Sequence, residues 1–410
     1  MSTASRHVSR LAVAVLAAGL LALLPAGAAR AGDWPAWLGP NRTGISQETG
    51  WRTDWKANPP AVLWTAKLGK GFSTVSVADG RAYTMGNSGG VDSVWCMDAD
   101  EGKLLWQHRY QCQPHDYEGP RCTPTVDGDR VYTLSNRGHL FCLDAATGKV
   151  KWFVETPNVL GSKPPRWGFA CSPLVLGNHL IVDVGPIAAF DKMTGKVGWK
   201  TGSDTAGYGS PIAFEHGGKT LVASFNAHGP IVVEADGGKI VTRERWKTSY
   251  DVNAVTPIVH DGGLFYSSGY NVGAALFKFT GNGLDEVWRN RNMRNHANNC
   301  VLSDGYLYGF DGQVNDGPLT CIAFDTGEKR WSEPTIRAGG LMLADGTLIC
   351  MAAKGECVLV KASPDACDIL GRKKLFEKKD TNWTHPVLAN GRIYCRSHKG
   401  DLAVLDVRKK

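Results

Sequence analysis

Polar, cationic and aromatic side chains stand directly before several short hydrophobic runs of this 410-residue chain. The densest group is MRNHANN (293–299), where five polar side chains precede one such run. Arginine can hold a carboxylate or phosphate through forked hydrogen bonds, and tryptophan can stack on a planar ring or a sugar. These side chains predict a site for a protein or for a small anionic or polyol ligand; the alternative is that they satisfy loop backbone groups. The predicted ligand-binding residues are Arg294, Asn295, His296, Asn298, Trp383, His385, Arg121, Trp167, Asp251 and Asn253.

The common catalytic and metal-binding motifs are missing from the sequence. It has no G-x-S-x-G, no H-E-x-x-H, no P-loop and no C-x-x-C, so hydrolase, zinc-protease and nucleotide-hydrolysing chemistry have no support. Asp251 and Asn253 are oxygen donors, but calcium takes about six to eight oxygen ligands. We therefore predict no metal site and assign no catalytic residue.

The cysteines permit disulfides if the protein is exported. There are 11 of them, so at least one thiol is free or pairs between chains. Cys112 and Cys122 flank the loop QPHDYEGPR and are the first candidate pair, and Cys350 and Cys357 flank an apparent hairpin and are the second. The alternative is that many of the cysteines are small buried apolar residues.

The first 31 residues resemble a secretory signal peptide. Arg6 and Arg10 precede the apolar run LAVAVLAAGLLALLP (11–25), and Ala29-Arg30-Ala31 fits the small-x-small cleavage rule. An uncleaved membrane anchor is the alternative for this run. No cysteine follows the run, so we predict an exported protein, periplasmic or extracellular, that is not a lipoprotein and has no transmembrane segment after cleavage.

The charge balance is weakly basic. The formal net charge is +7, and without the three arginines of the leader 43 basic residues face 39 acidic ones. This excess is too small and too dispersed to predict nucleic-acid binding.

A repeated unit that ends in tryptophan runs through the chain. Examples are CMDADEGKLLW, CLDAATGKVKW, AFDKMTGKVGW and AFDTGEKRW. The marks recur about every 45 residues, which is typical of the blades of a β-propeller. We predict that the tryptophans dock neighbouring blades together. The marks are Trp64, Trp106, Trp152, Trp199, Trp246, Trp288, Trp331 and, with phenylalanine instead, Phe376.

Each unit also carries the turn signals of a four-stranded antiparallel blade. Asp-Gly or Asn-Gly pairs between the first two strand patterns favour two-residue hairpin turns with positive φ. Proline recurs at the first strand pattern of five units, which favours an edge strand beside a central channel. The turn pairs begin at Asp79, Asp127, Asp261, Asp304, Asp345 and Asn390.

The two chain ends complete one blade between them. VLW at Trp64 has no preceding strands of its own, and PVLANGRIYCRSHKGDLAVLDV (386–407) supplies three strands without a closing tryptophan. Joined, they close an all-β, eight-bladed β-propeller. We predict a signal peptide over 1–31, an irregular lead-in over 32–60 that packs on the ring, and one propeller over 61–410.

The A-x-D-x-x-T-G-x-x-x-W unit resembles the tryptophan-docking repeat of PQQ-type propellers. That group includes quinoprotein alcohol dehydrogenases and the BamB outer-membrane assembly factor. DWPAWLGPNRTGIS, YDVNAVTPIV and MRNHANNCVLSDGYLYGFDG resemble exported PQQ-binding-like repeat proteins. The resemblance covers residues 33–408 and implies the eight-bladed fold.

The resemblance implies two functions. In the alcohol dehydrogenases, PQQ lies over a tryptophan beside a disulfide of adjacent cysteines, a calcium ion held by Glu, Asn and Asp, and an Asp base. This chain has no Cys-Cys pair and no matching calcium set, so no catalytic residue is carried over. We predict an exported, monomeric, non-catalytic binding or scaffold propeller similar to BamB and assign no cofactor. The alternative is a PQQ-dependent or related oxidoreductase acting on alcohols or sugars.

Overall fold

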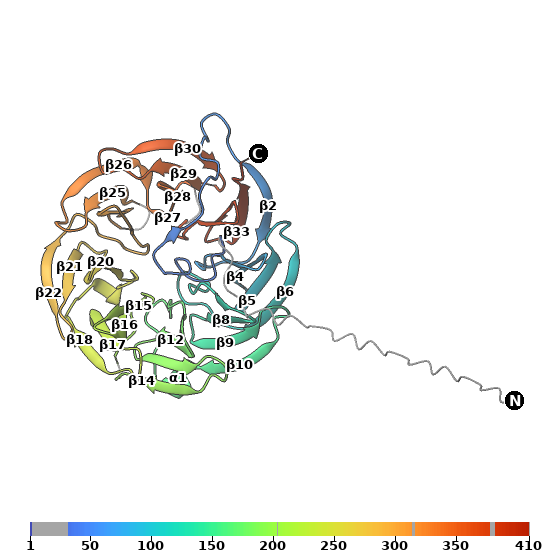
Figure 1. Ribbon diagram of the computed structural model, residues 1–410, viewed down its shortest axis with the longest axis vertical. Coiled ribbons are helices and arrows are strands. Elements are labelled where there is room, and N and C mark those ends of the chain that lie inside the picture. Colours follow the sequence, from blue (N-terminus) through green and yellow to red (C-terminus); the bar gives the residue numbers. More distant parts are fainter. Residues whose placement is uncertain (2–31, 203, 314–315, 378–381, 410) are drawn as a thin grey trace.

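The computed structural model describes residue 1 and residues 32–202, 204–313, 316–377 and 382–409. Strands of these residues form eight sheets arranged as blades around a central channel, seen end-on in Figure 1. This eight-bladed β-propeller confirms the predicted fold class. The predicted signal peptide lies outside the described residues except for Met1. In the described part of the chain, no helix is long and apolar enough to span a membrane.

Each blade is an antiparallel meander whose first strand faces the channel and whose last strand lies at the circumference (Figure 1). Blade 1 has β3 (Ser76–Ala78), β4 (Arg81–Ser88), β5 (Val91–Asp98) and β6 (Leu104–Gln111), and blade 2 has β7 (Thr125–Asp127), β8 (Arg130–Leu134), β9 (His139–Asp144) and β10 (Val150–Glu155). Blade 3 has β11 (Leu174–Leu176), β12 (His179–Asp183), β13 (Ile187–Asp191) and β14 (Val197–Lys200), and blade 4 has β15 (Ile212–His216), β16 (Lys219–Phe225), β17 (Pro230–Glu234) and β18 (Ile240–Arg243).

The second half of the ring repeats this pattern. Blade 5 has β19 (Ile258–His260), β20 (Gly263–Ser268), β21 (Gly273–Phe279) and β22 (Leu284–Asn290), and blade 6 has β23 (Val301–Ser303), β24 (Tyr306–Phe310), β25 (Pro318–Ala323) and β26 (Lys329–Arg337). Blade 7 has β27 (Gly339–Ala344), β28 (Thr347–Ala352), β29 (Glu356–Lys361) and β30 (Asp368–Lys374), and blade 8 has β31 (Val387–Ala389), β32 (Arg392–Arg396), β33 (Asp401–Asp406) and β2 (Ala61–Lys67). Strand β1 (Ile45–Ser46) adds a fifth strand to the sheet of blade 7, and the helical elements are α1 (Thr156–Leu160) and the 3₁₀ turn η1 (Ser249–Asp251).

The ring closes in blade 8, as predicted. Strand β2, from the N-terminal part of the chain, pairs antiparallel with β33 from the C-terminal part, with Ala61 opposite Asp406 and Lys67 opposite Asp401. Because β33 would otherwise present an open edge, this pairing removes a site of strand addition.

The predicted two-residue turns form in five of the six places. Asp79, Asp261, Asp304, Asp345 and Asn390 all have φ between 47° and 53°, and each is followed by a glycine of positive φ. In blade 2 the turn is shifted by one residue, because Asp127 pairs with Arg130 and the loop is Gly128-Asp129. Only Gly128 then needs the left-handed conformation.

The tryptophan that ends a repeat ties one blade to the next. Trp106 of blade 1 donates from Nε1 to the carbonyl of Ala145 in blade 2 at 3.0 Å. Gly148 of the blade 2 turn has φ +70°, and a Cβ added there would lie 2.5 Å from the indole. Glycine therefore serves both the turn and the contact. Equivalent bonds to the following blade are made by Trp64, Trp152, Trp199, Trp288 and Trp331.

Trp246 departs from this arrangement. It lies three residues beyond the end of β18, so its indole does not reach the next turn. Instead, Nε1 donates to Ser268 Oγ of blade 5 at 2.8 Å, and the Arg289 guanidinium lies 4.4 Å from the ring centroid. Blade 4 is thus joined to blade 5 by a different contact from the one that the repeat predicts.

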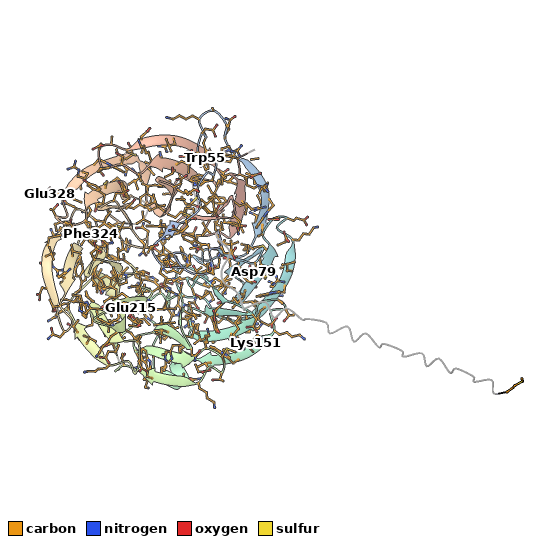
Figure 2. The ribbon with its side chains drawn as sticks, viewed as in Figure 1. Trp55, Asp79, Lys151, Glu215, Phe324 and Glu328 are labelled. Atoms are coloured by element: carbon orange, nitrogen blue, oxygen red, sulfur yellow. The ribbon has the colours of Figure 1, made fainter. Side chains whose placement is uncertain are left out.

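Apolar side chains fill the space between the blades. Figure 2 shows this filling, with Phe324 inside the ring and Glu328 at the circumference. One cluster joins Met85 of blade 1, Leu134 of blade 2 and Val182 of blade 3. The core is therefore a series of blade-to-blade interfaces.

The lead-in contacts the innermost strands of the ring and also enters the channel, which the sequence did not predict. Residues 33–48, here called the plug, enter at the end of the channel where the Asp-Gly turns lie, because Asp33 Oδ2 accepts from Asp79 N. The plug turns back at residues 38–42 and returns as β1, which runs parallel to β27. Glu48 then accepts from the backbone N–H groups of Asn390 and Gly391 at the same end.

Arg42 anchors the plug. Its guanidinium is buried and donates to the carbonyls of Ser172, Pro173 and Pro211, in blades 3 and 4. Burial lowers the pKa of Arg42 to about 10, so the side chain remains a cation at neutral pH.

Candidate functional site

A chain of hydrogen bonds joins the blades at the channel mouth, the end opposite the Asp-Gly turns. The N–H of Thr74 donates to Thr123 Oγ1, that of Thr123 to Ser172 Oγ, and that of Ser172 to Ser210 Oγ, at 2.9–3.2 Å. Each donor and acceptor stands just before an innermost strand. The mouth therefore holds side chains in fixed relative positions.

Blade 7 interrupts this pattern. Gly340 brings no side chain to the mouth, and a Cβ there would lie 2.5 Å from His385 Cα. The segment before β31 therefore covers blade 7, and His385 Nε2 accepts from Asn299 N of blade 6 at 3.3 Å. The other ring nitrogen, Nδ1, donates to the Leu341 carbonyl at 2.9 Å. Burial lowers the pKa of His385 to about 4, which favours this neutral form.

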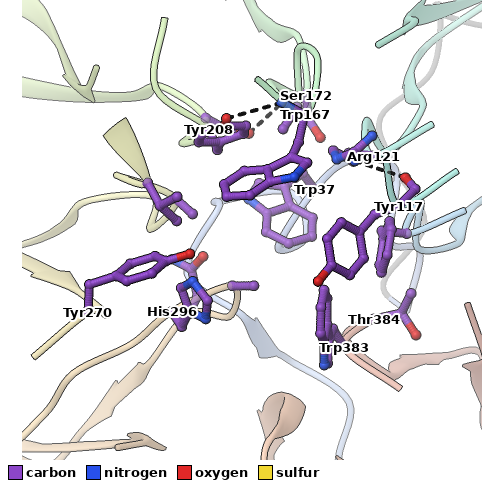
Figure 3. Close-up of a pocket in the computed structure, with 17 residues that line it drawn as sticks. Trp37, Tyr117, Arg121, Trp167, Ser172, Tyr208, Tyr270, His296, Trp383 and Thr384 are labelled. Atoms are coloured by element: carbon purple, nitrogen blue, oxygen red, sulfur yellow. Dashed lines mark hydrogen bonds between the residues drawn. The ribbon is translucent and has the colours of Figure 1, made fainter. Parts of the chain in front are cut away.

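A cavity of about 180 Å³ opens inside the mouth. We call it the cup. Figure 3 shows Trp37 of the plug at its centre, with Tyr117 and Trp383 on one side and Tyr270 and His296 across from them. The walls come from residues just before innermost strands and from the loop after β20. The cup is lined by Trp37, Phe72, Tyr117, Arg121, Trp167, Ala170, Ser172, Tyr208, Ser210, Val252, Ala254, Tyr270, His296, Ala297, Asn299, Trp383 and Thr384.

The aromatic rings around the cup form a continuous series in which each ring contacts the next one in space. We call this series the aromatic arc. Its centroid separations range from 4.8 to 6.3 Å, with stacked, tilted and edge-to-face geometry. Such pairs stabilise beyond their buried area and restrict one another. In order, the arc is Phe72, Trp383, Tyr117, Trp167, Tyr250, Tyr270 and His296.

Backbone strain is concentrated at the cup and the plug. Among the described residues, twelve that are not glycine have positive φ, and five of these are the hairpin Asp and Asn residues. Bulky side chains in this conformation are uncommon and tend to mark functional sites. The other seven all belong to the plug or to the loops around the cup: Leu38, Arg42, Tyr117, Tyr250, Asp251, Tyr270 and Asn271.

Arg121 is the charged side chain of the cup. Its guanidinium donates to the carbonyls of Gly119 at 3.0 Å, Tyr117 at 2.9 Å and Asp116 at 3.2 Å, and lies 5.5 Å from the Phe72 centroid. Burial lowers its pKa to about 10. Among the described residues, no acidic side chain lines the cup or forms an ion pair with Arg121. The cup is thus positively charged at neutral pH.

His296 and Trp383, both predicted ligand-binding residues, line the cup from opposite sides (Figure 3). The His296 ring meets Tyr270 edge to face at 4.8 Å. Burial lowers the pKa of His296 to about 4, so it adds no charge at neutral pH. With Arg121 and Trp167, these two are the predicted ligand-binding residues that the structure brings together in the cup.

Arg294 lies outside the cup. Its guanidinium is already held by Asp311, with Nε to Oδ1 at 2.7 Å and Nη2 to Oδ2 at 3.0 Å. The forked contact expected for a ligand carboxylate is therefore made within the protein.

The predicted asparagines and Asp251 also have internal partners. Asn295 is buried and donates to the Phe310 carbonyl, while Asn298 Oδ1 accepts from its amide. Asn253 Oδ1 accepts from Thr248 Oγ1 at 2.7 Å, and Asp251 pairs with Lys247. No group of His, Cys, Asp and Glu suited to a metal ion occurs in the described part of the chain.

The candidate disulfides are absent from the structure, where every cysteine is a free thiol. Cys112 Sγ donates to Asn136 Oδ1, and Cys122 Sγ donates to the Thr123 carbonyl. Cys350 pairs across the ladder with Val358, so Cys357 points to the opposite face of the sheet. The cysteines therefore follow the alternative reading as small buried residues, apart from half-buried Cys367.

Sequence reasoning missed several walls of the cup. Tyr117 lies in the loop QPHDYEGPR, of which the sequence predicted roles only for Arg121 and the flanking cysteines, and Trp37 lies in the lead-in. Phe72 precedes an innermost strand, which is the signal that could have found it. Tyr270 lies in the loop between β20 and β21.

The family model for the outer membrane protein assembly factor BamB matches residues 43–159 and 113–333, which together are more than half of the chain. The chain belongs to this family. A solved structure of BamB from Moraxella catarrhalis superposes with a TM-score of 0.63 at 20% identity, covering 85% of this chain and 98% of that one. At this identity the likeness shows the fold alone.

Quinone-dependent enzymes share the fold. The quinohemoprotein alcohol dehydrogenase from Comamonas testosteroni superposes with a TM-score of 0.66 at 14% identity, covering 93% of this chain and 82% of that one. The dehydrogenase subunit of a quinone alcohol dehydrogenase from Gluconacetobacter polyoxogenes is 31% identical over 143 residues, which is 31% of this chain and 19% of that protein. The match thus spans about a fifth of that enzyme.

The cup does not fit the group implied by these enzymes. Pyrroloquinoline quinone is a fused tricyclic tricarboxylate, whereas the cup offers one guanidinium and room comparable to that of a cavity that binds benzene. The described residues that line it include no carboxylate to act as a base, and no group of His, Cys, Asp and Glu suited to a metal ion occurs among them.

Proposed function

We propose that this protein is an exported, non-catalytic binding propeller and that the cup holds its ligand. The family description, an outer membrane protein assembly factor, supports export and a binding role. The proposal includes the predicted mature chain, which begins near Gly32 and comprises the lead-in and the propeller.

The observation that carries the proposal is the location of the strain. Bulky residues adopt the left-handed conformation in the plug and around the cup, and a fold selected for stability alone would place glycine there. The strained tyrosines Tyr117 and Tyr250 are each 54% exposed, so burial of their rings does not account for their positions.

A PQQ-dependent or related oxidoreductase is the second candidate. The aromatic walls favour it, because they suit a planar ring. The single guanidinium, and the lack of a carboxylate base or a metal-binding cluster in the described lining, oppose it.

Mass spectrometry of the purified protein tests the proposal. Ala297 lines the cup and is half-buried, so Ala297→Trp should fill the cavity. Ala57→Trp places the same side chain at an exposed position of the lead-in and is the matched control. We expect denaturation to release a small molecule from the wild type and from A57W, but not from A297W.

Absorption spectra and dye-linked alcohol oxidation separate the two candidates. The binding proposal expects no quinone band and no oxidation after incubation with PQQ and calcium. A bound quinone, or an alcohol oxidation that A297W abolishes, would establish the oxidoreductase instead.

A further inference from the structure

The size of the cup limits what it can hold. A cavity of about 150 Å³ lined by apolar side chains accommodates benzene, and the cup measures about 180 Å³. A single six-membered ring with one small substituent matches this volume, and a larger ligand must project beyond the arc. Size therefore favours one ring over a fused ring system.

Several polar groups of the lining already have partners within the protein. Ser172 Oγ and Ser210 Oγ accept backbone N–H groups, and Asn299 Nδ2 donates to the Thr256 carbonyl at 2.9 Å. A polyol needs many hydrogen bonds to replace those it makes with water. The remaining wall is mostly aromatic, which suits the faces of an unsaturated ring.

Arg121 retains donors for a ligand. Its bonds to Gly119, Tyr117 and Asp116 use three of the five N–H groups of a guanidinium. The loop that supplies these carbonyls wraps the side chain, so the cation is held in place before a ligand arrives. A desolvated cation that forms no close ion pair attracts an anion more strongly than an exposed one.

Arg42 adds a second charge beneath the floor. It donates to the carbonyl of Ser172, a residue that lines the cup. Because Arg42 is buried, this charge is weakly screened. Both cations therefore act on the same cavity, and the described lining contains no acidic side chain to oppose them.

We propose that the cup is selective for a single-ring aromatic carboxylate, whose ring lies among the arc residues and whose carboxylate is held by Arg121. This inference rests on the proposed function, because it names the ligand class of the same site. It resolves the open choice between an anionic and a polyol ligand in favour of the anion.

Fluorine NMR with matched probes tests the inference. 4-Fluorobenzoate and 4-fluorobenzamide share the ring and differ in charge, and myo-inositol represents a polyol. We expect the full-length protein to bind the benzoate at least tenfold more tightly than the benzamide, with added salt narrowing the difference, and inositol not to compete.

Two arginine variants assign the charge. Arg121→Gln should remove the preference for benzoate while leaving benzamide binding within about twofold, and this unchanged benzamide affinity shows that the cup is still folded. Arg109→Gln removes the same charge from an exposed position on β6 and should leave both affinities unchanged.

Three results would overturn the inference. Equal affinity of the wild type for the two probes would show that the cup does not select for charge. Equal losses of affinity for both probes in R121Q would show that Arg121 has a structural role. Either result would leave the proposed function unaffected. Tighter binding of PQQ than of benzoate would show that the cup accepts a fused ring system and would favour the oxidoreductase.

Discussion

The circumference and the mouth of this propeller differ in how regularly their contacts repeat from blade to blade. At the circumference, one contact recurs: a tryptophan donates to a carbonyl of the next blade and packs on its turn glycine, as Trp106 does with Ala145 and Gly148. At the mouth, the side chains that form the walls of the cup differ from blade to blade, and bulky side chains adopt strained backbone conformations. Repetition thus serves closure of the ring, whereas departure from repetition marks the place where a ligand can be held.

The largest expected effect comes from opening the ring. Deletion of residues 386–410 removes β31 to β33, leaving β2 without its partner and blade 7 without its neighbour on the blade 8 side. We expect aggregation or loss of cooperative unfolding, because unpaired strand edges recruit other chains. Calorimetry and light scattering measure this, and a truncated protein that melts as sharply as the full chain would contradict the observed closure.

Removal of one docking tryptophan should have the next largest effect. Trp106→Ala leaves a cavity between blades 1 and 2 and should lower the free energy of unfolding by about 3–5 kcal/mol. Affinity for a cup ligand should remain nearly unchanged at low temperature. Denaturant unfolding together with ligand titration checks both, and a loss of binding without a loss of stability would erase the distinction between circumference and mouth.

Lowering the pH should destabilise the folded protein through protonation of His385 at the mouth. Its pKa is about 4 in the folded protein, against an ordinary value of 6.5, so the unfolded chain binds more protons between these values. The stability of the wild type should therefore fall as the pH drops from about 6.5 to 4, by on the order of 3 kcal/mol from this residue.

The matched variant isolates this contribution. Buried Asp183, with a pKa raised to about 6 by desolvation, acts in the opposite sense over much of the same range. The measurement is therefore the difference in unfolding free energy between the wild type and His385→Gln at several pH values. A difference that is independent of pH would show that His385 does not titrate in this range.

The smallest expected effect on stability distinguishes the mouth from the circumference most directly. Tyr250→Gly removes a bulky side chain from a left-handed backbone position. It should therefore leave the free energy of unfolding unchanged or raise it by up to about 1 kcal/mol. Gly148→Ala at the circumference should destabilise, because the added Cβ meets the Trp106 ring. Thermal melting of the two variants measures both changes in stability. We also expect Tyr250→Gly to weaken ligand binding. A destabilised Tyr250→Gly would mean that the tyrosine supports the fold.

The circumference could be predicted from the sequence because its signals are local and repeated. The Asp-Gly pairs and terminal tryptophans recur at a fixed spacing, and Trp64 and residues 386–407 supply complementary parts of one blade. The position of a residue before an inner strand also placed Arg121, Trp167, His296 and Trp383 in one region.

The remaining features of the mouth depend on contacts between distant residues. Arg294 could not be excluded from the sequence, because its partner Asp311 lies on the loop after β24. The plug was missed because it has no repeat partner, and its Arg42 bonds to residues 130–169 positions away. The repeat predicts the wrong contact for Trp246, because the outer strand β18 ends before this residue.

The path of the plug has a consequence for the order of folding. Its residues leave the ribosome before any blade, yet Glu48 bonds to Asn390 and Gly391 more than 340 positions later in the chain. Contacts of such long sequence separation form slowly and late. The floor of the cup, made by Trp37, is therefore completed only after the last blade has been synthesised, so a prematurely terminated chain cannot compete with the finished molecule for ligand.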